Sequence, residues 1–459
     1  MTYFFETYGC QMNKAESAAL EQILIERGWS AAEHAETADL VVINTCSVRA
    51  TAETRIHGRL GWYSALKRER KGEKPKGYQR VARPVEVPVK PLTLVVAGCM
   101  AERLKDGLKR DFPVVDYVVG PFKKQHFCDI VSAVEQNLPL VKIEEESVYA
   151  FAPLSYEKGT FQAFVPIMHG CNNFCTYCIV PYVRGREISR SAAEIIREID
   201  MLSANNVREI TLLGQNVNSY KYEENGNPVD FPQLLQRICQ RLKDTNSSIK
   251  WVRFMSSHPK DLSDRLIDVI ASEPLICRHI HLPVQNGSTA VLKAMNRRYT
   301  REQYLELVAK IRSKIAGVSL STDILVGFPG ETNEDFEQTL SLMREVRYDT
   351  AYMYYYNPRE GTVACTMPNQ IPVEEKKARV DKVIQLQLEI TREQLKKRIG
   401  QTVDVLVEAT SRDSSRELLA RTERDERVVF EGDESLIGTF KTVHIEELNG
   451  NTFRAKVVE

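Results

Sequence analysis

Three cysteines lie close together near the middle of the chain, and their spacing fits a metal or redox centre. They are Cys171, Cys175 and Cys178, in the stretch GCNNFCTYCIVPYVRGR. Thiolates are the usual ligands of iron–sulfur clusters, and this Cys-x3-Cys-x2-Cys spacing can hold three corners of a 4Fe–4S cluster. The fourth iron would then have no protein ligand, so a substrate or cofactor could bind it directly.

A structural zinc site is the alternative interpretation of these cysteines, with His169 as a fourth ligand. Common zinc motifs contain two Cys-x2-Cys pairs or a distal pair of histidines, and the sequence has neither pattern here. The iron–sulfur interpretation is therefore favoured. We expect His169 at the end of a strand rather than on a metal.

Three further cysteines each end an apolar run, and the runs are TYFFETYGC, ADLVVINTC and LTLVVAGC. Such near-continuous apolar runs are typical of buried parallel strands. In an open α/β sheet ligands bind outside the carboxyl ends of the strands, so Cys10, Cys46 and Cys99 could converge on one point. The alternative is that each is simply a small buried residue. The remaining cysteines fit no ligand spacing and are interpreted as ordinary thiols: Cys128, Cys239, Cys277 and Cys365.

The elements that must position these cysteines fall into three segments. Residues 1–145 alternate short apolar strands with helical patterns, which predicts an open parallel-sheet α/β domain. Residues 155–385 contain six predicted strands separated by helices, too few for a closed eight-stranded barrel, so we expect a partial (β/α)6 barrel. Residues 396–459 contain short strands and turns, which predict a small antiparallel β-barrel. The sequence thus indicates a three-domain α/β protein.

A basic stretch interrupts the first segment at residues 67–90. It contains nine Lys and Arg against three Glu, a net charge of +6, with prolines and no periodicity. This composition predicts a flexible basic loop or insertion.

Composition favours a multidomain protein of the cytosol. At 459 residues with 43% hydrophobic and 27% charged residues, the chain exceeds one ordinary core. No apolar run approaches the roughly 18 residues that a membrane span needs, and the start MTYFFETYGC lacks the pattern of a signal peptide. Ten cysteines in an unexported chain are expected to stay reduced. A formal net charge of zero neither indicates nor excludes a nucleic-acid partner.

The residues around the cysteines resemble a known family. The stretches YGCQMNKAES, VINTCSVRATAE and VAGCMAERL, together with GCNNFCTYCIVPYVRGRE, are similar to the radical S-adenosylmethionine (SAM) methylthiotransferases, and YGCQMN is closest to the branch acting on N6-dimethylallyladenosine in tRNA. The resemblance implies two 4Fe–4S clusters, one on Cys171, Cys175 and Cys178 with SAM at its open iron, and an auxiliary one on Cys10, Cys46 and Cys99. It also implies that the C-terminal barrel is a TRAM domain. The basic insertion departs from the family pattern, which puts the path of that loop in doubt but not the cysteines.

That resemblance implies an enzyme that adds a methylthio group to C2 of N6-dimethylallyladenosine at position 37 of tRNA. Its partners would be the tRNA anticodon stem-loop and an electron donor such as flavodoxin or ferredoxin, and it would be a cytoplasmic monomer with no membrane association. Related enzymes acting on threonylcarbamoyladenosine in tRNA or on an aspartate of a ribosomal protein remain alternatives. A non-catalytic, zinc-containing RNA-binding protein is the alternative of another class.

SAM needs contacts beyond iron, and the strand ends of the predicted barrel are where such contacts should lie. The candidates follow the second, fourth and fifth predicted strands: Gln215, Asn216, Asn218, Gln285, Asp323 and Gly327. The family resemblance extends to the glycine-bearing stretch TDILVGFPGE, where a glycine would let the backbone approach adenine closely. The alternative is that amides and glycines at strand ends merely make turns.

Candidate RNA contacts are less specific. Arg184, Arg186 and Arg190 follow the cysteine loop and could contact phosphates, or they could be a solvated charge run. The run AYMYYYNPREGT has four tyrosines in five positions, which could stack on a base, although a place in the barrel core is favoured. Residues 399–459 contain eight Lys and Arg against thirteen Asp and Glu, a net charge of −5 that is unfavourable for phosphate binding. A local arginine patch could compensate: Arg412, Arg416, Arg421, Arg424 and Arg427.

Overall fold

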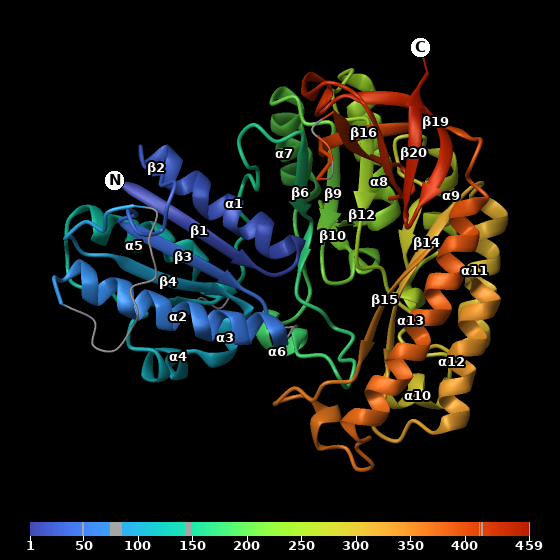
Figure 1. Ribbon diagram of the computed structural model, residues 1–459, viewed down its shortest axis with the longest axis horizontal. Coiled ribbons are helices and arrows are strands. Elements are labelled where there is room, and N and C mark those ends of the chain that lie inside the picture. The colour runs from blue at the N-terminus through green and yellow to red at the C-terminus, as the bar shows by residue number, and fades with distance from the viewer. Residues whose placement is uncertain (48–49, 74–84, 143–147, 413, 415, 459) are drawn as a thin grey trace. The chain divides into compact units, whose positions relative to one another are not determined.

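The computed structural model describes residues 1–47, 50–73, 85–142, 148–412, 414 and 416–458 (Figure 1). These residues form two compact units. The first comprises residues 1–158, 163–171 and 179–188, and the second comprises residues 159–162, 172–178 and 189–459. Among the described residues, every helix is too short or too polar to span a lipid bilayer.

The first unit is built on a parallel five-stranded sheet in the order β2-β1-β3-β4-β5. The strands are β1 (Thr2–Tyr8), β2 (Ser30–Ala31), β3 (Leu40–Thr45), β4 (Thr93–Gly98) and β5 (Tyr117–Val119). The helices are α1 (Gln11–Glu26), α2 (Ala50–Arg70), α3 (Cys99–Leu104), α4 (Asp106–Asp111), η1 (Pro121–His126) and α5 (Phe127–Glu135). The predicted open α/β sheet is confirmed.

Helices cover both faces of this sheet, which is why its strands read as continuous apolar runs. Val41 and Ile43 pack in one core with residues of α2, α3 and α4. Their neighbours Leu40 and Val42 point to the opposite face and pack with residues of α1 and α5. Side chains alternate across a strand, so both sets of β3 are buried, and the two layers are visible in Figure 1.

The predicted basic loop at residues 67–90 is partly wrong, because its first residues are helical. Lys67 to Arg70 form the last turn of α2. Arg70 is buried and donates to the carbonyl of Ala38 at 2.6 Å, while Lys67 forms an ion pair with Asp116. These cations therefore attach α2 to the sheet. Residues 74–84 of the stretch lie outside the described part of the chain.

The second unit contains five of the strands predicted for the partial barrel, with β12 paired to β9 and with β13, β14 and β15 in one sheet. Of the sixth strand, β6, only Gln162 belongs to this unit, and residues 163–166 belong to the first. The strands are β6 (Gln162–Pro166), β9 (Glu209–Leu213), β12 (Trp251–Phe254), β13 (His279–His281), β14 (Ser319–Val326) and β15 (Thr350–Tyr355). Helices alternate with them: α7 (Ala192–Ala204), α8 (Phe231–Asp244), α9 (Asp264–Ser272), α10 (Thr289–Ala294), α11 (Arg301–Lys314), α12 (Asn333–Val346) and α13 (Val373–Lys396). The pairs β9–β12, β13–β14 and β14–β15 are parallel. The expected six strands and the long helix α13 are confirmed.

Shorter elements complete the description of the chain before the C-terminal barrel. They are β7 (Met168–His169), α6 (Val180–Arg184), β8 (Ile188–Ser189), η2 (Val217–Ser219), β10 (Lys221–Glu224), β11 (Asn227–Asp230), η3 (Pro259–Asp261) and η4 (Val363–Thr366). β10 and β11 form an antiparallel hairpin.

The C-terminal residues close a five-stranded barrel in the order β16-β17-β18-β20-β19. Its elements are β16 (Thr402–Thr410), β17 (Glu417–Thr422), β18 (Arg427–Glu431), η5 (Glu434–Leu436), β19 (Phe440–Asn449) and β20 (Thr452–Val457). The predicted small barrel is confirmed, but it is not wholly antiparallel, because β18 and β20 pair in parallel. This pairing closes the cylinder and leaves no edge strand to cover.

The turn between β17 and β18 attaches this barrel to the central strands of the same unit. Arg253 on β12 donates to the carbonyls of Thr422 at 2.7 Å and Glu423 at 2.8 Å. Its Nε donates to Glu209 at 2.7 Å, a carboxylate that also accepts from Arg421 at 2.7 Å. Charged groups that leave water need such partners, so the turn is held by specific ionic contacts.

Candidate cofactor sites

The first cysteine set lies at the carboxyl ends of three adjacent parallel strands. Cys10 caps the N-terminus of α1 two residues after β1, Cys46 follows β3 directly, and Cys99 begins α3 directly after β4. The register of these strands sets Tyr8 beside Thr45 and Thr45 beside Gly98. The three cysteines therefore lie at one edge of the sheet, although the first and the last are 89 positions apart in the sequence, and their shared ligand role stays a prediction.

Local contacts favour the thiolate form of Cys10. The Cys46 thiol lowers the pKa of Cys10 to about 6, with burial opposing the shift and Arg184 and a backbone hydrogen bond of Asn13 assisting it. A thiolate is the form that binds metal. Burial raises the pKa of the Cys99 thiol, so metal binding would have to remove its proton. Three cysteine sulfurs at one edge of a sheet are a ligand set that fits an iron–sulfur cluster.

A buried amide pair fixes the loops that carry these cysteines. Asn13 donates to Asn44 Oδ1 at 2.9 Å and to the carbonyl of Thr45 at 3.1 Å. The amide of Asn44 returns a bond to the carbonyl of Asn13 at 2.9 Å. Gly98 has a φ of +91°, and a Cβ there would lie 2.4 Å from Asn44 Oδ1 and from the Thr45 carbonyl oxygen, so only glycine fits the position before Cys99.

A buried arginine stands directly beside Cys99. Arg184, in α6, is 3% exposed, and its Nε lies 3.1 Å from Cys99 Sγ. Its Nη1 donates to Glu16 Oε1 at 3.0 Å, and Lys124 donates to the same oxygen at 3.0 Å. Although burial alone would raise it, the pKa of Glu16 is lowered to about 2 by these two cations. Two cations and one carboxylate thus leave a net positive charge beside the thiols.

His169 lies at the end of a strand, in β7, as expected. Its ring stacks on Tyr149 with centroids 3.6 Å apart and planes 6° apart. Burial, with Arg184 and Lys124 nearby, keeps the pKa of His169 well below its usual value. The imidazole is therefore neutral and packed between neighbours.

The second cysteine set is divided between the two units, so each part is described by itself. In the first unit Cys171 is buried, and its amide donates to the carbonyl of Gly185 at 3.1 Å. In the second unit the amide of Cys178 donates to the carbonyl of Cys175 at 2.9 Å, forming a tight turn. Arg297 Nη1 lies 3.4 Å from Cys175 Sγ. The ligand role of these cysteines stays a prediction.

Residues that follow helix α10 bind the second part of this loop by hydrogen bonds. Asn296 donates to the carbonyls of Asn173 at 3.1 Å and Phe174 at 3.0 Å, and the amide of Thr176 donates to the carbonyl of Met295 at 3.1 Å. Sequence reasoning missed Asn296 and Arg297, because neither belongs to a spacing motif.

Buried polar atoms without partners mark the candidate SAM site. Within the described residues, five side chains after β9 and β12 each leave at least one buried polar atom without a hydrogen bond: Gln215, Asn216, Asn218, Ser257 and His258. Such atoms are costly unless a ligand or water satisfies them. The three amides were predicted as SAM contacts, whereas Ser257 and His258 were not.

His258 presents a hydrogen-bond donor at this site. Burial lowers its pKa to about 2, with further lowering by Arg297, so the ring is neutral. Its Nδ1 accepts from the amide of Lys260 at 3.3 Å, which assigns the proton to Nε2, the atom left without a partner. A donor of this kind suits a carboxylate or hydroxyl of SAM.

The remaining predicted SAM residues lie near the ends of β13 and β14. Gln285 has a φ of +73°, a conformation that is costly for a residue with a side chain and is often found at ligand sites. Its amide donates to the carbonyl of Asp323 at 2.9 Å. Gly327 has a φ of +70°, and the space of a Cβ is occupied by the Lys376 side chain at 2.5 Å. Lys376 therefore provides a second reason for glycine here, beside the predicted approach of adenine.

The predicted RNA contacts of Arg184 and Arg190 are not supported, because both side chains are buried in ion pairs. Arg184 pairs with Glu16 as described, and Arg190 pairs with Glu198 inside the second unit. Neither guanidinium can face a phosphate while so buried. Arg186 is exposed, and its RNA contact stays a prediction.

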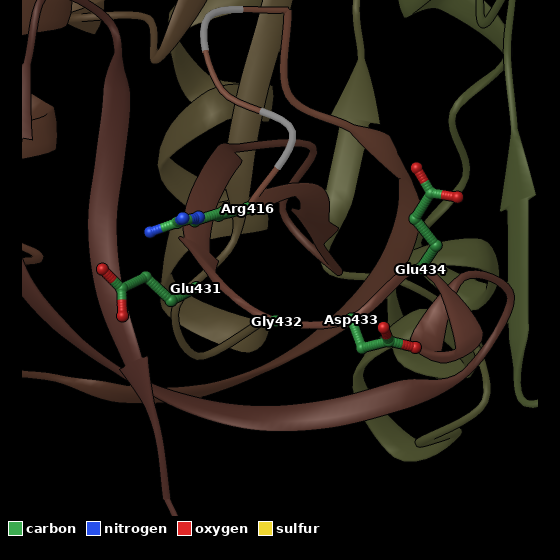
Figure 2. A pocket seen from close by; sticks show the side chains of 5 residues that line it. All are labelled: Arg416, Glu431, Gly432, Asp433 and Glu434. Atoms are coloured by element: carbon green, nitrogen blue, oxygen red, sulfur yellow. The ribbon is translucent and has the colours of Figure 1, made fainter.

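Two of the five arginines in the predicted patch of the C-terminal barrel are engaged in ion pairs. Arg421 pairs with Glu209, Glu408 and Asp425, and Arg424 pairs with Asp349 and Glu426. A hollow of about 570 Å³ on this barrel is lined by Arg416, Glu431, Gly432, Asp433 and Glu434 (Figure 2). Three carboxylates against one guanidinium make it a poor site for phosphate.

Comparison with known families matches three parts of the chain. Residues 2–120 match an uncharacterized protein family, UPF0004, residues 165–343 match the Radical SAM superfamily, and residues 396–458 match the TRAM domain. These three matches correspond to the sheet of the first unit, the partial barrel and the C-terminal barrel.

Relatives are similar over the whole chain. A protein of Treponema pallidum (strain Nichols) named tRNA-2-methylthio-N(6)-dimethylallyladenosine synthase is 51% identical over 100% of this chain and 99% of its own length. A protein of the same name from Porphyromonas gingivalis (strain ATCC BAA-308 / W83) is 41% identical over 99% of this chain and 95% of its own. Among solved structures, the radical S-adenosylmethionine methyltransferase TsrM from Kitasatospora setae has a TM-score of 0.58 and 13% identity over 79% of this chain and 74% of its own. The last similarity concerns the fold alone.

Proposed function

Because this chain belongs to the family of the tRNA-2-methylthio-N(6)-dimethylallyladenosine synthases, we propose that it adds a methylthio group to C2 of N6-dimethylallyladenosine at position 37 of tRNA. The observation that carries the proposal is identity of 41% to 51% with relatives of that name over at least 99% of the chain. Radical SAM, TRAM and UPF0004 matches cover the corresponding domains. The related substrates, threonylcarbamoyladenosine and a ribosomal protein aspartate, are not favoured by these relatives, and neither is a non-catalytic zinc protein.

Membership of the Radical SAM superfamily implies one 4Fe–4S cluster and SAM. Cys171, Cys175 and Cys178 are the proposed ligands of that cluster. The unsatisfied atoms of Gln215, Asn218 and His258 would bind polar groups of SAM. These atoms support a polar ligand at this end of the barrel, since they have no other partner among the described residues.

A second 4Fe–4S cluster is proposed on Cys10, Cys46 and Cys99. The place of the three cysteines at one edge of the sheet, the lowered pKa of Cys10 and the nearby positive charge of Arg184 support it. An arginine beside thiolates offsets the negative charge that three thiolates bring to a cluster. When bound, SAM and the two clusters supply the methyl group and the one-electron chemistry by which an unactivated C–H bond is replaced.

The protein supplies binding, orientation and protection of the reacting groups. Position 37 lies in the single-stranded anticodon loop, where bases can be splayed out and read by stacking and hydrogen bonds. We propose the anticodon stem-loop as the partner, a flavodoxin or ferredoxin as electron donor, a monomer as the working state and the cytoplasm, where tRNA is modified, as its location.

Iron and sulfide analysis of anaerobically purified protein tests the two-cluster proposal. Wild-type protein should hold about eight irons, and a Cys171/Cys175/Cys178 triple Ala variant about four. A Cys10/Cys46/Cys99 triple Ala variant should also hold about four. Wild-type protein with zinc and no iron would rule out both clusters.

Nucleoside mass spectrometry of tRNA tests the substrate. A strain lacking the gene should lose 2-methylthio-N6-dimethylallyladenosine and accumulate N6-dimethylallyladenosine. Unchanged levels of the methylthio nucleoside would contradict the proposed reaction.

A further inference from the structure

Two tyrosines of β15 are exposed although they lie on a barrel strand. Tyr352 is 42% exposed and Tyr354 is 44% exposed. Their neighbour Ala351 is buried, and α13 packs against β15 (Figure 1). Side chains alternate along a strand, so both tyrosines point to the face opposite that of Ala351. The expectation that this run is barrel core is therefore wrong for these two residues, and right for Tyr356, which is buried.

Polar groups share this face with the tyrosines. In the parallel register of β14 and β15, Asp323 lies beside Tyr352 and Leu325 beside Tyr354. The His281 ring contacts Tyr352 edge to face, with centroids 5.8 Å apart and planes 74° apart. The Asp323 carboxylate lies 3.6 Å from His281 Nε2. The face thus offers two aromatic rings with hydrogen-bonding groups at one end.

A cation of the C-terminal barrel lies close to this face. The β17–β18 turn lies beside the start of β15, because Arg424 donates to Asp349 at 2.8 Å, and Arg427 is exposed directly after this turn, at the start of β18. Arg421 and Arg424 are engaged by carboxylates. Among the described residues, the Arg427 side chain has no such ion pair, which leaves it available to a phosphate.

We propose that Tyr352 and Tyr354 form a stacking surface for a nucleobase of the RNA substrate, with Arg427 binding a phosphate next to it. This inference rests on the proposed function and names the residues that would hold its substrate. Exposed aromatic rings with an adjacent cation are the means by which proteins bind single-stranded RNA. A purine with an apolar N6 substituent suits the site, because its ring stacks on tyrosine and its substituent covers apolar ring surface. Arg427 would then give the acidic TRAM barrel one cation for a phosphate of the RNA.

The first test measures binding of a fluorescent anticodon stem-loop, bearing N6-dimethylallyladenosine at position 37, to the reconstituted holoenzyme by anisotropy. Tyr352→Ala and Tyr354→Ala should each weaken binding about tenfold, whereas Tyr352→Phe and Tyr354→Phe should bind within about twofold of wild type because the ring remains. Tyr182→Ala is the matched control, since Tyr182 is also an exposed tyrosine and belongs to the first unit. Iron content and circular dichroism should be unchanged in all variants.

The second test uses salt dependence. Arg427→Gln should reduce the slope of log affinity against log salt by about one, while Arg416→Gln, in the acidic hollow of Figure 2, should not change it. Binding within about twofold of wild type for both tyrosine-to-alanine variants would overturn the inference, even if the enzyme still makes the methylthio product. A wild-type enzyme that makes no methylthio nucleoside would overturn the proposed function, and this inference with it.

Discussion

Replacing Arg184 with methionine should destabilise the first unit strongly. Arg184 is 3% exposed and contacts Cys99 Sγ and Glu16. Methionine keeps much of the side-chain volume but removes the charge, leaving Glu16 buried with Lys124 alone. Breaking a buried ion pair costs about 3–5 kcal/mol in free energy of unfolding when one charge is left uncompensated; because Glu16 keeps Lys124 as a partner, we expect a smaller loss of about 2–3 kcal/mol.

The lowered pKa of Glu16 gives a second value for the free energy that its two cations, Arg184 and Lys124, contribute. Arg184 and Lys124 outweigh burial and lower this pKa from 4.5 to about 2, which corresponds to roughly 3 kcal/mol. A group whose folded pKa is lowered stabilises the fold above its unfolded pKa. That contribution is lost as the pH falls from 4.5 to about 2. The difference in free energy of unfolding between wild type and Arg184→Met should therefore become smaller as the pH falls through that range.

Urea unfolding of the full-length apoprotein measures this effect. In a Trp251→Phe background the remaining tryptophans, Trp29 and Trp62, both lie in the first unit and report its unfolding. Arg110→Met, which changes a first-unit arginine whose side chain is 80% exposed, is the control and should change the free energy by less than about 0.5 kcal/mol. A Glu16→Gln/Arg184→Met double variant should be less stable than Arg184→Met alone, because it leaves the buried Lys124 cation without its carboxylate partner. A loss below about 1 kcal/mol for Arg184→Met, or a double variant as stable as the single one, would refute the reasoning.

Three further changes test other parts of the structure. Gly98→Ala should lower the free energy of unfolding by more than about 2 kcal/mol and reduce iron content, since the new Cβ would lie 2.4 Å from atoms of Asn44 and Thr45. The control Gly107→Ala should be neutral or slightly stabilising, because the nearest atom to its Cβ is 3.7 Å away. Equal effects of the two substitutions would contradict this prediction. His258→Ala should weaken SAM binding to the holoprotein about tenfold by calorimetry, because a buried donor is lost, while the exposed His57→Ala should have no effect; unchanged affinity would exclude His258 from the SAM site. Arg421→Met should lower the free energy of unfolding of the second unit by about 3 kcal/mol. Trp251 fluorescence during urea unfolding measures this loss, with Arg416→Met as the control. A loss below about 1 kcal/mol would show that the ion pairs of Arg421 are not needed for stability.

Sequence reasoning succeeded where spacing and strand type determine position. Parallel neighbouring strands end at one edge of a sheet, so apolar runs ending in Cys10, Cys46 and Cys99 were enough to place these residues at the same sheet edge. The order of the strands was not needed. The same reasoning placed Gln215 and Asn218 at the carboxyl end of the central strands.

It failed where burial depends on a distant partner. Arg184 belongs to a basic run and resembles a phosphate ligand, but its carboxylate partner Glu16 lies 168 positions away in a helix that gives no sign of this pairing. His258 is a single histidine without a spacing motif, so only its buried, unpartnered nitrogen identifies it. The alternation of β15 predicted that Tyr352 and Tyr354 share a face, but not that α13 covers the other one.

The contacts of the β17–β18 turn limit how far the small barrel can move when RNA binds. Arg253 binds this turn to β12 through two carbonyls and a shared carboxylate. The small barrel is therefore held against β12 and is not a freely moving domain. Adjustment falls instead to the nucleic acid, whose loop must open until the target nucleotide leaves its stack, a step that costs a few kcal/mol. Transcripts whose loops are already loose would then react sooner than those with tightly stacked ones.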